Sequence, residues 1–124
     1  MSSTAQEQLE KNVMEMILRG DDANRAILRN QYLSSSVKSR EYTGVGFFTH
    51  FCVPPELPRV IDKKNFKLDG VGAEVPTVRY GISFILFVRD GALDWLEGFT
   101  YDDPWPDDLT GITLSYEEIH RSDE

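Results

Sequence analysis

His50 and Cys52 are the first residues of this sequence whose side chains could do chemistry. They lie two positions apart, so on a β-strand they would share a face, as in half of a zinc site or a thiol–imidazole pair. A complete zinc site needs further ligands, but the chain has no second cysteine, and its other histidine, His120, lies in the acidic C-terminal segment. We therefore expect no metal and no thiol catalysis, and we expect Cys52 to behave as a small buried hydrophobic residue.

Two glycine pairs and one serine raise the question of a phosphate loop or a hydrolase nucleophile. The glycine pairs are Gly44-Val45-Gly46 and Gly70-Val71-Gly72. A dinucleotide-binding loop needs a further glycine and a helix directly after it, and neither pair has them. Glycine within a strand more often marks the close approach of another chain segment. Ser83 lacks the following glycine of a nucleophile elbow, so we expect neither a cofactor nor a serine hydrolase.

Glu97 is the carboxylate that the pattern singles out. It falls opposite Phe84 on an otherwise apolar strand face, where it would pair with Arg79 or Arg89 or would line a pocket. The adjacent acidic pairs are expected to stay solvated and ionised: Asp102-Asp103, Asp107-Asp108 and Glu117-Glu118. One hypothesis is a pocket between the helices and the sheet, favoured by a titratable residue within a dense apolar strand. Its lining would be His50, Arg79, Tyr80 and Glu97.

The segment 98–108 offers a different kind of site, a surface for a protein partner. Trp105 is held between Pro104 and Pro106, and carboxylates flank it on both sides. A rigid aromatic side chain ringed by acids suits a partner that presents lysine or arginine beside an apolar groove. In the alternative interpretation, Trp105 folds back and caps the core. The predicted partner-binding residues are Tyr101, Asp102, Asp103, Trp105, Asp107 and Asp108.

The negative charge of the chain is concentrated near its C-terminus. Of a formal net charge of -8 over 124 residues, residues 102–124 contribute -7, from eight acidic side chains and Arg121. A field of that sign attracts cationic partners and disfavours nucleic acid. In the alternative interpretation, the acidic segment serves only solubility.

Length and composition limit the class of protein. With 40% hydrophobic and 27% charged residues, the sequence predicts a single globular domain spanning 1–124. A single cysteine excludes an internal disulfide, and no apolar run is long enough for a membrane span. We expect no signal peptide, because no charged-then-apolar start precedes a cleavage site. We therefore expect a cytoplasmic protein without membrane association, and disorder at 120–124.

The first third of the sequence has helical spacing. Thr4 begins a capping-box pattern, an apolar stripe follows it, and residues 1–3 are expected to be frayed. Asp21 or Asp22 would cap a second helix that runs to about Leu33 and forms a hairpin or a corner with the first. The inner face of the second helix would carry Ala23, Ala26, Ile27 and Leu33.

From Arg40 onward, β-branched and aromatic residues between glycines and prolines predict strands. The expected segments are 42–53, 66–75, the two arms of 82–101, and 112–116. Asp90-Gly91 suits a type I′ turn between the arms. The first arm is apolar on both faces and the second is mixed, which predicts that the second arm lies nearer a sheet edge. The order of elements predicts an α+β domain, with an N-terminal two-helix pair packed on an antiparallel sheet of about five strands.

Several stretches combine strand and turn residues in a recognisable order. They are Tyr-Thr-Gly-Val-Gly-Phe-Phe-Thr-His-Phe-Cys-Val at 42–53, Phe-Ile-Leu-Phe-Val-Arg-Asp-Gly at 84–91, Leu-Glu-Gly-Phe-Thr-Tyr at 96–101, and Trp105-Pro106. These stretches resemble a group of small uncharacterised bacterial proteins, and the last of them also resemble immunity proteins of bacterial toxin systems. The resemblance implies a small cytoplasmic α+β domain with an inhibitor-type binding role, and it transfers no catalytic residue.

The sequence therefore supports hypotheses from different functional classes. We favour a non-catalytic protein-binding module, immunity-like, that binds a basic partner through residues 101–108, because no set of nucleophile, base and orienting group can be assembled. The alternative is a small-molecule-binding domain or a small enzyme with a pocket near His50. A third hypothesis is homo-oligomerisation through an unpaired edge strand, for which 112–116 is the candidate.

Overall fold

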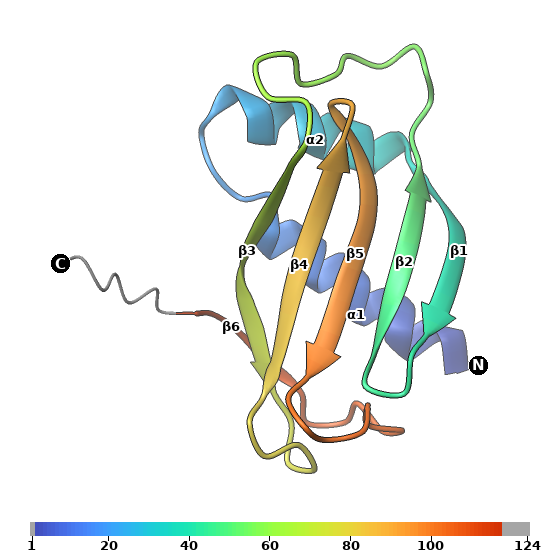
Figure 1. Cartoon of the computed structure of the whole chain (residues 1–124), viewed down its shortest axis with the longest axis vertical. Helices are drawn as coiled ribbons and strands as arrows, with labels where there is room; N and C mark the ends of the chain where they lie inside the picture. The colour runs from blue at the N-terminus through green and yellow to red at the C-terminus, as the bar shows by residue number, and fades with distance from the viewer. Residues whose placement is uncertain (1, 118–124) are drawn as a thin grey trace, which may run out of the picture.

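Two helices cover one face of a six-stranded antiparallel sheet, so the α+β class predicted from the sequence is confirmed (Figure 1). The computed structural model describes residues 2–117, and the expected disorder at 120–124 lies outside the described residues. The helices are α1 (Ser2–Ile17) and α2 (Ala23–Ser34). The strands are β1 (Ser36–Tyr42), β2 (Gly46–Cys52), β3 (Phe66–Glu74), β4 (Ile82–Arg89), β5 (Ala92–Thr100) and β6 (Thr113–Tyr116).

The strand order is β1-β2-β5-β4-β3-β6, with every pairing antiparallel. β6 is therefore an edge strand, as the sequence suggested. The prediction that the second arm of the hairpin lies near an edge is wrong, because β5 lies between β2 and β4 in the middle of the sheet. In Figure 1 both helices lie behind the sheet, and the opposite face, which we call the outer face, is turned to the viewer.

The strand beyond the five expected is β1, which the sequence pattern did not predict. Its residues are polar and mostly exposed, so they lack the apolar alternation by which strands are recognised. The predicted strand 42–53 is interrupted at residues 43–45, where the Thr43 N–H donates to the Gly46 carbonyl at 2.9 Å. β1 then pairs with β2 from Ser36 to Tyr42, with one irregularity in the register.

Both helices occur where the sequence predicts them, but their ends differ in detail. α1 begins at Ser2, before Thr4, so the predicted capping box is wrong, and residues 2 and 3 are helical. Asp22 caps α2 as expected, because its side chain accepts a hydrogen bond from the Arg25 amide at 3.1 Å.

The predicted inner face of α2 is partly wrong. Ile27 packs against the core, but Ala23 and Ala26 are exposed and Leu33 is 83% exposed. Gln31 is fully buried instead. The polar residue Gln31 is therefore buried near the end of α2, where the apolar pattern predicted Leu33 to be buried.

Gln31 is buried because it connects α2 to the β4–β5 turn and to the loop before β3. Its amide donates to the carbonyls of Pro58 and Gly91, at 2.9 and 3.0 Å. Its side-chain oxygen accepts from the Leu93 N–H at 3.0 Å. Three hydrogen bonds thus satisfy this side chain inside the protein.

The β4–β5 hairpin turns at Asp90-Gly91 as predicted, with φ of 53° and 76° at the two residues. Its register differs from the prediction, because a bulge beside Phe87 shifts the pairing by one residue. Glu97 therefore lies opposite Ile85 and not opposite Phe84. Since a shift of one residue exchanges the two faces of a strand, the Glu97 side chain belongs to the outer face.

The core lies between the helices and the inner face of the sheet. Glycine permits its tightest packing: a Cβ on Gly98 would lie 2.5 Å from the Phe47 ring and 2.9 Å from the Phe84 ring. Gly46 lies against the Gly98 carbonyl, so this glycine serves a close approach of two strands, as predicted. The largest fully buried apolar side chains are Phe47, Phe84, Met14, Leu18, Leu28, Ile82, Leu86 and Leu96.

An ionic cluster is buried between α1 and the strands β1 and β2. Glu10, which is 3% exposed, accepts from the Arg40 guanidinium through both carboxylate oxygens at 2.8 Å. It also accepts from the Thr49 hydroxyl at 2.6 Å and from the Gln6 amide at 2.8 Å. The hydrogen bonds to Glu10 raise the pKa of Arg40. The cluster fixes α1 to both strands with every charge matched.

Candidate functional site

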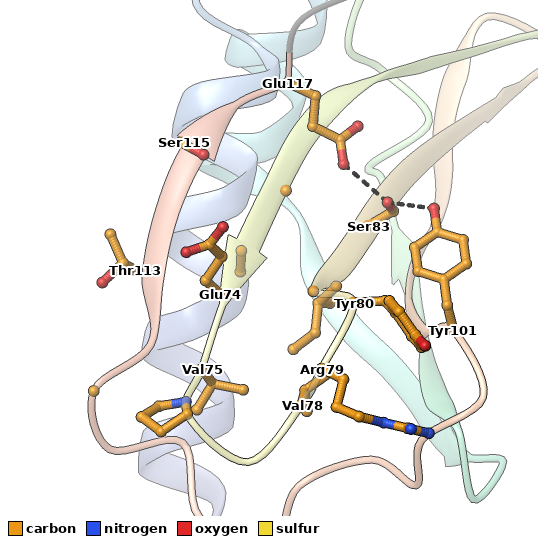
Figure 2. A pocket seen from close by; sticks show the side chains of 16 residues that line it. Glu74, Val75, Val78, Arg79, Tyr80, Ser83, Tyr101, Thr113, Ser115 and Glu117 are labelled. Atoms are coloured by element: carbon orange, nitrogen blue, oxygen red, sulfur yellow. Dashed lines mark hydrogen bonds between the residues drawn. The ribbon is translucent and has the colours of Figure 1, made fainter.

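A pocket of about 790 Å³ lies beside β3, β4 and β6, next to the loop that joins β3 to β4 (Figure 2). Arg79 and Tyr80, which the sequence assigned to a pocket, both line it. Tyr101, which the sequence assigned to a partner surface, lines the same pocket. The structure therefore joins parts of two predicted sites in one place.

Three polar side chains form a connected network in this pocket (Figure 2). Ser83 Oγ on β4 lies 2.7 Å from Tyr101 Oη and 2.9 Å from Glu117 Oε2. Because a carboxylate oxygen only accepts, Ser83 donates to Glu117, and the Tyr101 hydroxyl donates to Ser83. Gly72 makes room for this arrangement, since a Cβ there would lie 2.5 Å from Glu117 Oε2.

The network presents fixed polar groups to the pocket and not a free nucleophile. A hydroxyl beside a carboxylate is one element of nucleophilic catalysis. Ser83, however, is 8% exposed and is held by a hydrogen bond on each side, in the interior of a strand. A donor and acceptor set of this kind is suited to holding a polar ligand group.

Arg79 is held against the acidic loop that follows β5. Its backbone N–H donates to Asp103 Oδ2 at 2.8 Å, and its Nε lies 3.5 Å from Asp103 Oδ1. The Arg79 guanidinium also lies over the Tyr80 ring, 5.2 Å from the centroid. Asp103 is only 14% exposed. Of the predicted partner-binding acids, it is the one that fastens two loops of the chain to each other.

Trp105 packs toward the core. Its ring centroid lies 5.2 Å from that of Phe47, edge to face, and its backbone N–H donates to the Gly44 carbonyl at 2.8 Å. The side chain is half-buried against the core cluster. This is the placement of the alternative interpretation, in which Trp105 caps the core.

Three of the predicted partner-binding carboxylates are exposed: Asp102, Asp107 and Asp108. Hydrogen bonds from the Thr110 side chain and backbone lower the pKa of Asp108, whose Oδ1 accepts from the Thr110 N–H at 2.9 Å. Tyr101, at the start of the same segment, is 46% exposed. Because residues 102–117 contain no lysine or arginine, the segment has no internal cation to balance these charges.

His50 and Glu97 do not join Arg79 and Tyr80. They project from the outer face of β2 and β5, away from the helices, so the predicted pocket between helices and sheet does not bring the four residues together. His50 Nε2 lies 3.7 Å from Glu41 Oε1. The expectation for Cys52 is also wrong: it lies on this uncovered face and is exposed.

Glu97 is half-buried on the outer face, and burial raises its pKa. The two cations considered for it have other partners. Arg79 pairs with Asp103, and the Arg89 Nε lies 3.3 Å from Asp94 Oδ2. Among residues 2–117, no hydrogen bond or ion pair reaches the Glu97 carboxylate.

Comparison of the chain with protein-family models, with curated proteins and with solved structures finds no match. Among the described residues, no group of three or more His, Cys, Asp and Glu side chains is arranged to hold a metal ion. None of the helices within residues 2–117 is long and apolar enough to cross a membrane. A functional assignment therefore depends on the geometry of the chain itself.

The sequence reasoning missed the Ser83–Glu117 pair. The sequence pattern predicts Glu117 as one of two solvated neighbouring acids, and it offers Ser83 only as a candidate nucleophile. The available signal was Gly72, which lies opposite Ser83 in the β3–β4 register. A glycine opposite a serine leaves a space on that face of the sheet, and the carboxylate of Glu117, directly after β6, fills it.

Proposed function

We propose that this chain is a non-catalytic protein-binding module, immunity-like, that inhibits a basic protein partner in the cytoplasm. The observation that carries the proposal is the unbalanced carboxylates of one segment: Asp102, Asp107 and Asp108 are exposed, and no lysine or arginine occurs between 102 and 117. Exposed Tyr80 and Tyr101 lie beside the same segment. Tyrosine is enriched in protein interfaces, whereas scattered solubilising charges need no aromatic neighbours.

The physical role of the carboxylates in this proposal is to steer the partner. Like charges gathered at one place attract a basic protein over several ångströms and raise the rate of encounter. Salt screens such an effect, since the Debye length at physiological ionic strength is about 8 Å. A steering surface therefore changes the association rate more than the dissociation rate, and most at low salt.

The test uses the basic protein that the chain retains from extract of its native host at low salt. We expect Asp107→Lys/Asp108→Lys to slow the association of that purified protein at least about tenfold at low salt, and less as salt increases. Stopped-flow fluorescence measures the rate. The matched control is Glu56→Lys/Asp62→Lys, which changes the net charge equally in the exposed loop before β3.

The control decides between local steering and total charge. A smaller effect of Glu56→Lys/Asp62→Lys than of Asp107→Lys/Asp108→Lys supports the proposal. Equal rates for the two variants, or retention of no basic protein at low salt, would count against it.

A second candidate function is the binding of a small polar molecule in the pocket beside Ser83. The observation that favours it is the fixed network of Tyr101, Ser83 and Glu117. A ligand bound there should raise the unfolding temperature of the wild type and should do so less in Ser83→Ala. A thermal-shift screen of polar metabolites measures both. An equal shift in the two proteins would place the ligand elsewhere.

A further inference from the structure

The outer face of the sheet carries large apolar side chains on its central strands β2, β4 and β5. These strands face the viewer in Figure 1, with both helices on the other side. The side chains are half-buried, and the Phe87 and Trp95 rings stack with centroids 4.3 Å apart. Contiguous apolar surface on a folded domain marks an interaction site. We call this set the aromatic face: Phe48, Ile85, Phe87, Trp95 and Phe99.

Glu97 lies at the centre of the aromatic face. In the sheet register it is opposite Phe48 on β2 and opposite Ile85 on β4. Trp95 and Phe99 are its neighbours along β5 on the same face, because alternate residues of a strand point the same way. A carboxylate among apolar groups and without a cation is costly, and a cation brought by a partner would remove that cost.

We propose that the aromatic face is the docking site for an arginine side chain of the basic partner, stacked on the rings and paired with Glu97. The inference rests on the proposed function and names the chemistry at the centre of the interface. Arginine fits this face better than lysine, because its planar guanidinium stacks on aromatic rings and can form two parallel hydrogen bonds with a carboxylate. The chain already shows such stacking at the margin of the face, where the Arg89 guanidinium lies 5.5 Å from the Trp95 ring centroid.

The aromatic face continues into the acidic segment. Phe99 lies edge to face with Tyr101, with centroids 5.5 Å apart, and Asp102 follows directly. Asp108 lies beside Gln8 and Asn12 of α1, on the helix side of the sheet, so it attracts the partner only from a distance. Asp102, which follows Tyr101, is the acid of the segment that adjoins the aromatic face. Apolar anchors at the centre and charges at the rim are the usual arrangement of a protein interface.

A second copy of this chain fits the aromatic face less well than a basic partner does. Each copy has a formal net charge of -8, so two copies repel each other on approach. A two-fold axis through the centre of the face would also bring both Glu97 carboxylates together in apolar surroundings. Charge complementarity therefore favours a partner of opposite sign.

The test is an NMR titration of the ¹⁵N-labelled full chain with N-acetyl-arginine amide and with its neutral isostere, N-acetyl-citrulline amide. Trp95 and Trp105 are the only tryptophans, so the Trp95 indole signal reports on the face, and that of Trp105 is an internal control. We expect saturable shifts at Trp95, Phe48 and Ile85 with the arginine probe, and at least about fivefold weaker binding of citrulline. In Glu97→Gln the advantage of arginine over citrulline should vanish, with the Trp105 signal unchanged.

Several outcomes would overturn the inference. They are equal binding of the two probes, arginine binding that survives Glu97→Gln, shifts confined to residues 101–108, and a dimer in sedimentation whose formation shifts the Trp95 signal.

Asp107→Lys/Asp108→Lys separates this inference from the proposed function, because it should leave probe binding unchanged. If the steering experiment fails while Glu97-dependent probe binding holds, the proposed function fails alone. If steering holds and the probe does not bind, this inference fails alone.

Discussion

Two carboxylates at opposite faces of the sheet, Glu10 and Glu97, differ in their hydrogen-bond partners. Beneath the helices, the buried carboxylate of Glu10 and the buried amide of Gln31 have hydrogen-bond partners on both of their terminal atoms. On the outer face, Glu97 has no partner among the described residues, and the buried Trp95 indole N–H has no acceptor there. Glu10 and Gln31 therefore hold the fold together through their hydrogen bonds, whereas the Glu97 carboxylate makes none within the described residues.

The largest expected effect on stability comes from substituting Arg40, the cation that pairs with the buried Glu10 carboxylate. Arg40→Met leaves the Glu10 carboxylate buried without its cation, which should lower the free energy of unfolding by about 3 kcal/mol. This value is at the low end for a buried pair, because the Arg40 side chain remains 21% exposed. Urea unfolding followed by tryptophan fluorescence measures the loss.

The control for Arg40→Met is Arg89→Met, which removes the cation of the exposed pair with Asp94. Exposed pairs contribute about 0–1 kcal/mol, so the two losses should differ clearly. Adding Glu10→Leu to Arg40→Met should recover part of the stability, because the uncompensated buried charge is then gone. Equal losses for the two arginine variants would mean that the Glu10 cluster is no more structural than a surface pair.

A smaller loss is expected at Gln31. Gln31→Leu fills the same space but leaves the Pro58 carbonyl and the Leu93 N–H without partners, while the Gly91 carbonyl keeps its bond from the Val60 N–H. Unsatisfied buried groups of this kind should cost about 2–3 kcal/mol in unfolding free energy. Urea midpoints measure the change.

Leu33→Gln is the matched control for Gln31→Leu, since it makes the reverse exchange on the same helix. Leu33 is 83% exposed, so its substitution should change stability by less than about 0.5 kcal/mol. A larger loss at Leu33 than at Gln31 would contradict the burial that the structure assigns to α2.

The sequence predicted most of the architecture, but it did not predict the partners of Glu10 or the outer position of Glu97. The reason is that sequence patterns express local preferences. Apolar periodicity and the Asp90-Gly91 turn express local preferences, and they give the helices, the hairpin and the fold class. The partners of Glu10 lie 30 and 39 positions away, at Arg40 and Thr49, and a pattern that repeats locally cannot show them. The outer position of Glu97 depends on one bulge, which nothing in the hairpin sequence specifies.

The smallest predicted effect is a pH dependence of the unfolding free energy that arises from Glu97 on the outer face. Burial raises the pKa of Glu97 in the folded chain above its usual value of 4.5, so the folded state binds the proton more tightly than the unfolded state. The Glu97 contribution to stability is therefore fully present below pH 4.5 and is lost as the pH rises through the folded pKa.

Glu97→Gln removes this dependence, because its neutral amide cannot ionise. The variant should match the wild type below pH 4.5 and exceed its unfolding free energy at pH 7, by about 0.5 kcal/mol. Urea midpoints of both proteins at the two pH values measure the difference, and the comparison within each pH cancels the titration of the other carboxylates. A wild type that is more stable than Glu97→Gln at pH 7 would mean that the carboxylate already has a cation in the free protein. Glu97 would then be a structural group like Glu10, and the two carboxylates would not differ in kind.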